Sequence, residues 1–559
     1  MSRRRGHRVL LLGLVLLTYA TRLHRLTAQS LWRDEVDAIY FSLRHLPDTL
    51  AMFVQAGQNG ALFFLTLRPW FKLVGSSEFA LRYPSAWFSV LAVPLLWQVA
   101  RLLIPSAASN AATPSTEATS AEATSVEATG AASPTTPPVH RLAAGWSALL
   151  SNAPLAAVLF LIANPYLLWY GQEGKMYALA TALALLATWL WLRGIRDPET
   201  AGQWRVWLGY LVTVSIAIYS HLLMIMLIPL HMLWFLLAWP QSRRHWRGYS
   251  LALAGLTLPY VPLLLWQWAL LFDSQKRTGF NFTPPVEMLQ KVILDYTRGF
   301  RAPEDLLWLA PFFFMALAGL LMGFLEVRPA GDDGLPDLSP VRRHLLLLSW
   351  LLVPLALIYL LSLRQPIFTP RYVIWIAPAA LMFMALGLQL LWRNGGRLAM
   401  PLATGLLVYT LGFWGYVGWQ QQHAPIKYDL RSAVTTIAQQ RTPDDLLILQ
   451  IPHMEFAYRY YSSDLGPDPF AESDARLGRW MPGLWTNNGW PDEQARADVD
   501  QQMRANTQGV AEIWVMRSEV EMWDSRYLMD EWLQANGELL DEANFHGTQV
   551  RHYRLQSDP

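Results

Sequence analysis

The chain has 559 residues, of which 53% are hydrophobic and 15% charged, and its formal net charge at pH 7 is +2. A net charge so close to zero provides no global basic field for binding nucleic acid. The sequence contains no cysteine, which excludes disulfides, thiolate metal ligands and a cysteine nucleophile.

The apolar residues come in blocks of about 20, the length that crosses the hydrocarbon layer of a bilayer. Candidate spans are residues 8–26, 84–104, 142–163, 176–193, 205–221, 222–240, 249–271, 305–325, 345–363, 372–392 and 398–419. The first has no small-residue cleavage site after it, so we interpret it as an uncleaved span rather than a signal peptide. The sequence therefore predicts a polytopic α-helical membrane protein with about 11 transmembrane helices.

The short connections on one side of these spans are rich in arginine, as at Arg3–Arg5, Arg243–Arg244 and Arg342–Arg343. The positive-inside bias then places the N-terminus in the cytoplasm. An odd number of spans places the loop of residues 27–83 and the C-terminus on the opposite side. We expect a multi-pass protein of the cell membrane (plasma or inner membrane).

Composition divides the chain into four regions. Residues 1–104 hold the first two spans and the long outer loop 27–83. Residues 105–140 are rich in Ala, Ser, Thr, Pro and Glu, which predicts a disordered cytoplasmic linker. A mucin-like stalk is the alternative. The remaining spans and loops occupy 141–419, and 420–559 reads as an extracytoplasmic α/β domain.

Local patterns predict individual elements within these regions. In the outer loop, 49–53 and 61–74 have the pattern of amphipathic helices at a membrane surface. In the C-terminal region, periodicity predicts helices and buried strands. The helices are 429–440 and 525–535, and the strands are 445–451, 511–516 and 548–555.

The concentrated acids lie at the predicted outer ends of spans, at Asp34, Glu35, Asp37 and Glu173. A transporter more often places a lone acid near the bilayer midplane. Transfer of a sugar from a lipid-phosphate donor needs one general base and fixed cations for the leaving phosphate. Neighbouring Asp34 and Glu35 would point about 100° apart on a helix, whereas Asp34 and Asp37 share a face. A solvated loop face or a helix cap is the alternative interpretation of these acids.

Basic residues also lie at the predicted outer ends of spans. Lys175, Arg371 and Arg364 lie at predicted outer span ends and are suited to a phosphate. His221 at another span end is a candidate substrate contact, with simple packing as the alternative.

Four separated motifs resemble those of the GT-C superfamily of membrane glycosyltransferases, and most of all bacterial glycosyltransferase family 39. That family is related to the protein O-mannosyltransferases and the aminoarabinose transferases. The motifs are Ser30-Leu31-Trp32-Arg33-Asp34-Glu35, Ser77-Glu78-Phe79-Ala80-Leu81-Arg82-Tyr83-Pro84-Ser85, Trp169-Tyr170-Gly171-Gln172-Glu173-Gly174-Lys175-Met176-Tyr177 and Phe368-Thr369-Pro370-Arg371-Tyr372. They occur in the family's order.

The resemblance implies an inverting glycosyltransferase that takes a hexose or pentose from a polyprenyl-phosphate carrier. Asp34 would be its base, with Glu35 and Glu173 as supporting acids. Lys175 and Arg371 would contact the donor phosphate. Tyr177 and Tyr372, at the ends of the same motifs, are further candidate substrate-binding residues. Lys175 stands where the family usually has Arg, so the charge is kept and the planar fork is lost.

Asn59 stands where many relatives have His, which leaves a His-dependent donor contact or a divalent cation open at that position. The expected partners are the donor lipid, a protein or glycolipid acceptor and the bilayer, with no nucleic acid. The alternatives are a flippase for polyprenyl-linked glycans and a sibling enzyme that modifies glycolipid rather than protein.

Overall fold

The computed structural model describes residues 2–104, 149–196, 203–239, 241–272, 280–301, 306–325, 338–394, 396–462 and 476–556. The linker predicted at 105–140 is outside the described residues. The chain forms two compact units. Unit 1 comprises residues 1–21, 88–171 and 177–418, and unit 2 comprises residues 22–87, 172–176 and 419–559.

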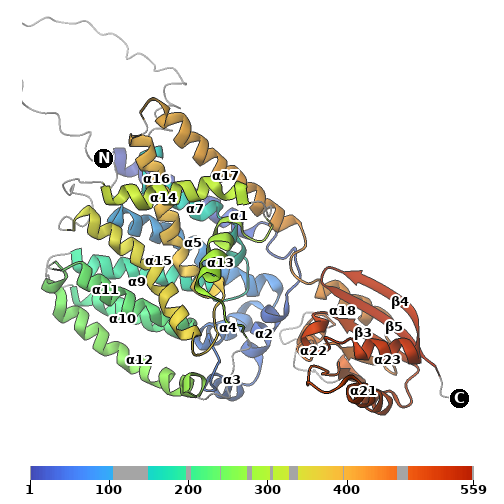
Figure 1. Ribbon diagram of the computed structural model, residues 1–559. Helices are drawn as coiled ribbons and strands as arrows, with labels where there is room; N and C mark the ends of the chain where they lie inside the picture. Colours follow the sequence, from blue (N-terminus) through green and yellow to red (C-terminus); the bar gives the residue numbers. More distant parts are fainter. Residues whose placement is uncertain are drawn as a thin grey trace, which may run out of the picture. The chain divides into compact units, whose positions relative to one another are not determined.

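The first part of the chain, up to His423, is helical (Figure 1). Its α-helices are α1 (Ser2–Leu23), α2 (Arg33–Leu43), α3 (Leu46–Phe53), α4 (Ala61–Val74), α5 (Glu78–Leu103), α7 (Ala153–Ala163), α8 (Pro165–Gly171), α9 (Tyr177–Arg196), α10 (Gln203–Ser220), α11 (Leu227–Leu237), α12 (Trp246–Phe272), α13 (Pro285–Arg298), α14 (Ala310–Leu325), α15 (Pro340–Ser362), α16 (Ala377–Asn394) and α17 (Ala399–His423). The short 3₁₀ helices are η2 (Leu222–Met226), η3 (Ser242–His245), η4 (Leu306–Leu309), η5 (Pro370–Ile376) and η6 (Gly396–Leu398). The helices predicted at 49–53 and 61–74 are confirmed as α3 and α4.

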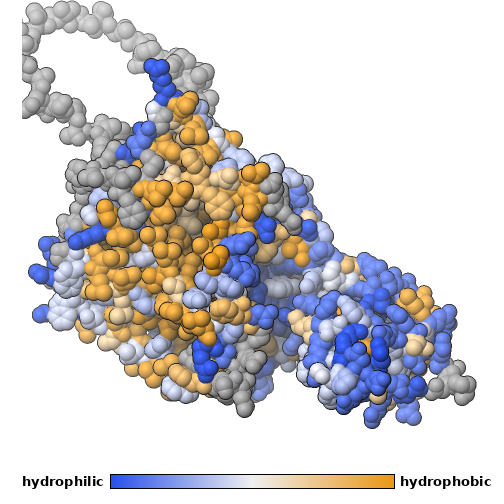
Figure 2. Space-filling model, viewed as in Figure 1, coloured by the Kyte–Doolittle hydropathy of each residue, from blue (hydrophilic) through white to orange (hydrophobic). Residues whose placement is uncertain are grey.

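By length and composition, six of the described helical segments can cross a membrane, and the bent pair α7–α8 would make seven. The six are Glu78–Leu103, Tyr177–Arg196, Ser242–Leu270, Pro340–Ser362, Pro370–Asn394 and Gly396–His423. Helices of this class expose leucines such as Leu258 and Leu360, and hydrophobic side chains spread over the surface of unit 1 (Figure 2). The number of 11 spans stays a prediction.

Small residues and breaks shape the helical unit. Helices α14 and α16 touch backbone to backbone, since a Cβ on Gly387 would lie 1.9 Å from the carbonyl oxygen of Met315. Such close approach is typical of helix packing in membranes. Helices α7 and α8 bend by 59° at Asn164, whose side chain accepts from the N–H of Leu167 and donates to the carbonyl of Tyr296.

Unit 2 contains a five-stranded sheet in the order β2-β1-β3-β5-β4. Its strands are β1 (Leu446–Leu449), β2 (Trp480–Pro482), β3 (Glu512–Arg517), β4 (Gly537–Phe545) and β5 (Thr548–Leu555), and its helices are α18 (Leu430–Gln440), α19 (Met454–Tyr461), α21 (Asp492–Thr507), α22 (Val520–Trp523) and α23 (Leu528–Asn536). Strands β2, β1 and β3 are parallel, and β5 pairs antiparallel with β3 and β4.

Alternate residues of the central strands face opposite sides of this sheet. Ile448 and Val515 pack in one core with Val499 of α21 and Leu533 of α23. Figure 1 shows both helices beside the sheet. The predicted helix 429–440 and strand 548–555 match α18 and β5, and the strands predicted at 445–451 and 511–516 match β1 and β3. Strands β2 and β4 were not predicted.

Candidate functional site

Helix α2 positions the acids of the first motif. Asp34 and Glu35 occupy its first turn, where the unpaired backbone N–H groups favour negative charge. The face with Glu35, Val36 and Ile39 is buried, and α2 packs against α4 and α19. Asp34 is half-buried on another face, which it shares with Asp37. The two neighbouring acids therefore have different surroundings, as the helical spacing predicts.

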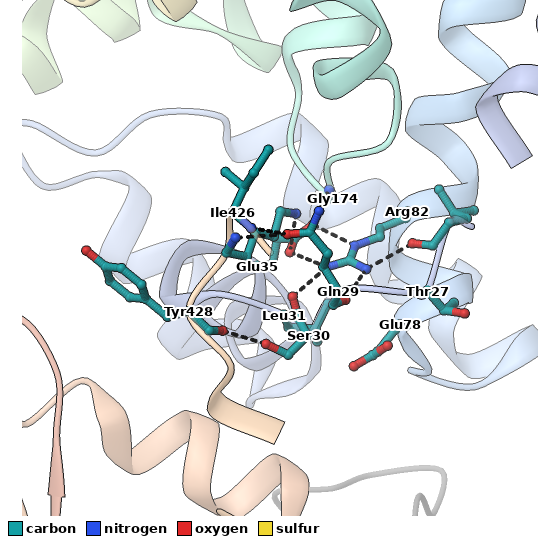
Figure 3. A network of polar contacts seen from close by, with 12 residues as sticks. Thr27, Gln29, Ser30, Leu31, Glu35, Glu78, Arg82, Gly174, Ile426 and Tyr428 are labelled. Carbon is teal, nitrogen blue, oxygen red and sulfur yellow. Dashed lines mark hydrogen bonds and ion pairs between the residues drawn. The ribbon is translucent and has the colours of Figure 1, made fainter. Parts of the chain in front are cut away.

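Glu35 is completely buried and accepts four hydrogen bonds (Figure 3). Arg82 of α5 binds both of its oxygens, Nε to Oε1 at 2.9 Å and Nη2 to Oε2 at 2.7 Å. The N–H of Gly174 donates to Oε1 at 2.8 Å, and Nζ of Lys427 donates to Oε2 at 2.8 Å. The carboxylate thus joins α2, α5, the third motif and the segment after α17; we call these four residues the Glu35 network.

The Glu35 network keeps its carboxylate ionised. Burial by itself raises the pKa of Glu35, but the charges of Arg82 and Lys427 and the hydrogen bonds from Arg82 and Gly174 hold it well below its usual range. Burial also lowers the pKa of Lys427, and Arg82 adds to this effect while Glu35 opposes it. A carboxylate with both oxygens engaged and a very low pKa is a poor proton acceptor. We therefore propose a positioning role for Glu35.

A glycine in the third motif makes this contact possible. A Cβ at Gly174 would lie 2.4 Å from the side chain of Leu81, so a larger residue would push the backbone away from α5. With glycine, the N–H of residue 174 reaches Glu35 directly. Gly174 therefore has two roles in the third motif: it leaves room for Leu81, and its N–H binds Glu35.

Further hydrogen bonds fasten the chain around the network. Gln29 Oε1 accepts from the N–H groups of Ile426 and Lys427, and Ser30 Oγ donates to the carbonyl of Tyr428 (Figure 3). Arg82 Nη2 also donates to the carbonyl of Ser30. The first motif and the segment 426–428 are thereby held together although they are about 400 residues apart.

Asp37 and Lys175 are a second pair of charged residues in unit 2, outside the Glu35 network. Burial raises the pKa of Asp37 to about 6; the positive charges of Lys175 and Arg33 oppose this rise and the charge of Asp34 adds to it. Among the described residues, Asp37 Oδ1 is buried without a hydrogen-bond partner. Nζ of Lys175 lies 5.6 Å from the ring centroid of Phe64. The predicted phosphate ligand Lys175 therefore interacts electrostatically with Asp37.

Glu173 and Asn59 belong to the same unit. Glu173 is buried, and its charge acts on Lys427. Asn59 lies in the loop between α3 and α4, between Gly57 and Gly60, which both have positive φ. The structure thus places Glu173 near the Glu35 network, and Asn59 at the start of α4.

The remaining predicted residues gather in unit 1. The guanidinium carbon of Arg371 lies 5.9 Å from the ring centroid of Tyr177 and 5.8 Å from that of Tyr372. The ring of His221 lies 6.1 Å from that of Tyr177 and 5.3 Å from that of Tyr372. His221 has extended backbone between α10 and η2 and is buried. The planar guanidinium of Arg371 is the group of this cluster that can bind a phosphate.

Sequence reasoning missed three residues that shape this region. Arg82 lies in the second motif, but the motif gives it no role, and Lys427 and His453 lie outside every motif. The fields of Arg33, Glu519 and Asp34 act on His453, whose pKa is lowered first by burial. In the part of the chain that the structure describes, no cluster of three His, Asp or Glu residues could hold a metal ion.

The sequence matches no family model and no curated protein. Solved structures do match. ArnT from Cupriavidus metallidurans in the apo state aligns with a TM-score of 0.56 and 14% identity, and its complex with undecaprenyl phosphate with 0.52 and 12%. Each alignment covers 98% of this chain and 98% of that chain. The chain has the fold of the GT-C glycosyltransferases.

A second GT-C structure gives a similar result. The archaeal oligosaccharyltransferase AglB from Archaeoglobus fulgidus, in complex with an inhibitory peptide and a dolichol-phosphate, aligns with a TM-score of 0.53 and 12% identity. That alignment covers 99% of this chain and 75% of the AglB chain. The resemblance of the four motifs to the GT-C superfamily is confirmed at the level of the fold, and membership of family 39 stays a prediction.

Proposed function

We propose that the chain is an inverting membrane glycosyltransferase that moves a hexose or pentose from a polyprenyl-phosphate carrier to an acceptor hydroxyl on the outer face of the cell membrane. The fold supports this proposal, because ArnT was solved with undecaprenyl phosphate and AglB with a dolichol-phosphate. The apolar helices support the membrane location. In this proposal the C-terminal sheet is extracytoplasmic and the N-terminus cytoplasmic.

The observation that carries the proposal is the contrast between Asp34 and Glu35. Glu35 is held ionised in a network that leaves neither oxygen for a substrate proton. Asp34 is half-buried, at the start of the same helix, and it is fixed there by its neighbour. A reactive group held by a rigid neighbour is the arrangement that general-base catalysis needs.

The proposed reaction is a single displacement. Asp34 accepts the proton of the acceptor hydroxyl, whose oxygen attacks the anomeric carbon from the face opposite the phosphate. The bond from the anomeric carbon to the phosphate oxygen breaks, and the polyprenyl phosphate leaves with its electron pair. Lys175, which belongs to the same unit as Asp34, would stabilise the charge that grows on the phosphate. Arg371, with Tyr177 and Tyr372 beside it, is a separate candidate contact for the donor lipid within unit 1.

The decisive experiment compares Asp34→Asn with the wild type. Sugar transfer from a polyprenyl-phosphate donor should fall by about 10² to 10⁴, the usual contribution of a general base, while donor binding persists. Asp37→Asn is the matched control, because it removes a carboxylate from the same face of α2. Wild-type transfer by Asp34→Asn would refute the assignment of the base. Movement of the lipid across vesicles without any transfer would instead favour a flippase.

A further inference from the structure

In the parallel half of the sheet in unit 2, the carboxyl ends of β1, β2 and β3 lie on one side. Open α/β sheets bind ligands in the crevice outside these ends, particularly between neighbouring parallel strands. Here the segments that follow β1, β2 and β3 are residues 450–453, 483–491 and 518–523. Any ligand of this sheet would be expected among these three segments.

Helix α2, which carries Asp34, is fastened to the same edge. Nη1 of Arg33 lies 3.1 Å from Oε2 of Glu519 and 3.6 Å from Sδ of Met522. Tyr40 stacks on Phe456 with a centroid distance of 4.0 Å. The charge of Asp34 acts on His453, in the segment after β1. The candidate base and the carboxyl-end edge of the sheet are thus parts of one region of unit 2.

Two indole side chains lie close together in this region, Trp485 exposed and Trp523 partly buried. Trp485 is 56% exposed and its ring centroid lies 6.5 Å from that of Trp523. Met522, which touches Arg33, is 48% exposed. We call Trp485, Met522 and Trp523 the tryptophan platform. Exposed apolar clusters with a polar surround mark binding surfaces.

The tryptophan platform is held in a fixed shape. The N–H of Thr486 donates to the carbonyl of Trp523, and Oγ1 of Thr486 donates to Asp524. The side chain of Asn487 donates to the carbonyls of Glu521 and Met522. The segments after β2 and β3 therefore support each other, and the indole rings project from an ordered surface. A binding surface ordered beforehand loses less entropy when a ligand arrives.

We propose that the tryptophan platform binds the acceptor of the transferase and that this acceptor is a carbohydrate. This inference rests on the proposed function. One face of a sugar ring presents C–H groups that stack on indole rings, while its hydroxyls need polar groups at the rim. The carboxylates of Glu519 and Glu521 lie at this rim.

The rim chemistry disfavours the other two classes of occupant. Anionic lipid surfaces attract clusters of lysine and arginine, whereas here Arg33 is paired with Glu519 and Arg526 with Asp492. Extended peptides are commonly bound by backbone pairing with the edge of a sheet, and the platform presents side-chain faces. Carbohydrate is the class that needs flat aromatic faces together with carboxylate acceptors.

The test measures binding to the full-length protein in detergent, by calorimetry. The probes are soluble hexaoses of glucose, mannose and xylose, a serine- and threonine-rich peptide, and vesicles of phosphatidylglycerol with phosphatidylethanolamine. We expect saturable binding of at least one hexaose, weakened about tenfold or more in Trp485→Ala and Trp523→Ala and largely restored in Trp485→Phe. Leu539→Ala, at an exposed leucine of β4, is the matched control and should bind like the wild type.

Binding of the peptide or the vesicles in place of the hexaoses would overturn the proposal, and so would the absence of hexaose binding. Unchanged hexaose affinity in Trp485→Ala would also overturn it. This variant is the more informative of the two, because the exposed Trp485 tolerates substitution more readily than Trp523. Kinetics separate this proposal from the proposed function. If the function is right, Trp485→Ala raises the acceptor KM and leaves the donor KM unchanged. Hexaose binding without any sugar transfer would leave the platform standing and refute the transferase.

Discussion

Replacing Glu35 by glutamine should loosen the junction between the first motif and the segment 426–428. The NH2 group of glutamine donates and cannot accept, so in either orientation the two hydrogen bonds of the oxygen that it replaces are lost. Each is a bond to a charged group or a buried N–H, at about 1 to 3 kcal/mol. Arg82 and Lys427 also lose their buried counter-charge. The expected cost is about 3 to 5 kcal/mol, as for other buried ion pairs broken on one side.

Hydrogen exchange measured by mass spectrometry reports this cost locally. Peptides that cover residues 172–176 and 426–428 contain the N–H groups of Gly174, Ile426 and Lys427. If the junction opens as a unit, a loss of about 3 kcal/mol raises their exchange rates on the order of 100-fold. Lys427→Met should have a smaller effect, since Arg82 still binds both oxygens of Glu35.

A surface pair provides the control. Arg496 and Glu531 also form an ion pair, but both side chains are about half exposed. Glu531→Gln should leave exchange in both peptides unchanged, because water replaces the partner. The reasoning would be refuted if Glu35→Gln left the exchange of these peptides at wild-type rates, or if Glu531→Gln raised it equally.

Three further predictions address other parts of the chain. The pKa of Asp37 in the folded protein, about 6, lies above its value in an unfolded chain. The stability of the fold should therefore fall as pH rises from about 4 to 6. In thermal unfolding measured across this range, Asp37→Asn should flatten the dependence on pH. Gly387→Ala should lower the melting temperature, because the new methyl group meets the carbonyl of Met315, whereas Gly405→Ala, with open space around it, should not. Arg371→Ala should weaken donor binding more than Arg371→Lys in a direct assay with polyprenyl phosphate, and equal affinity for both variants and the wild type would remove this residue from the donor site.

The sequence predicted α3 and α4, most of the apolar helices and three strands of the sheet, because local periodicity determines these elements. Strand β2 was missed because it has only three residues, and β4 because its pattern is polar, with Glu538, Asp541 and Glu542 among its nine residues. Such strands depend on pairing with β1 and β5, which a local pattern does not contain.

In the candidate site, too, local geometry could be predicted from the sequence and long-range contacts could not. Helical geometry alone separated Asp34 from Glu35 and grouped Asp34 with Asp37. The role of Glu35 depends on Arg82 and Lys427, which lie 47 and 392 positions away in the chain. The burial of Glu35 and the raised pKa of Asp37 both result from tertiary packing. Sequence reasoning therefore found the charged residues and could not assign their partners.

The position of Lys427 also bears on what the C-terminal region does. Composition changes at residue 420, and the predicted α/β domain starts there. The compact unit crosses this boundary, since it contains residues 22–87 together with residues 419–559. Lys427 neutralises Glu35, Gln29 binds the backbone of the same segment, and Arg33 reaches Glu519 beyond β3. Both ends of the first motif are thus held by the C-terminal region, which makes that region part of the support for Asp34 rather than an appended module.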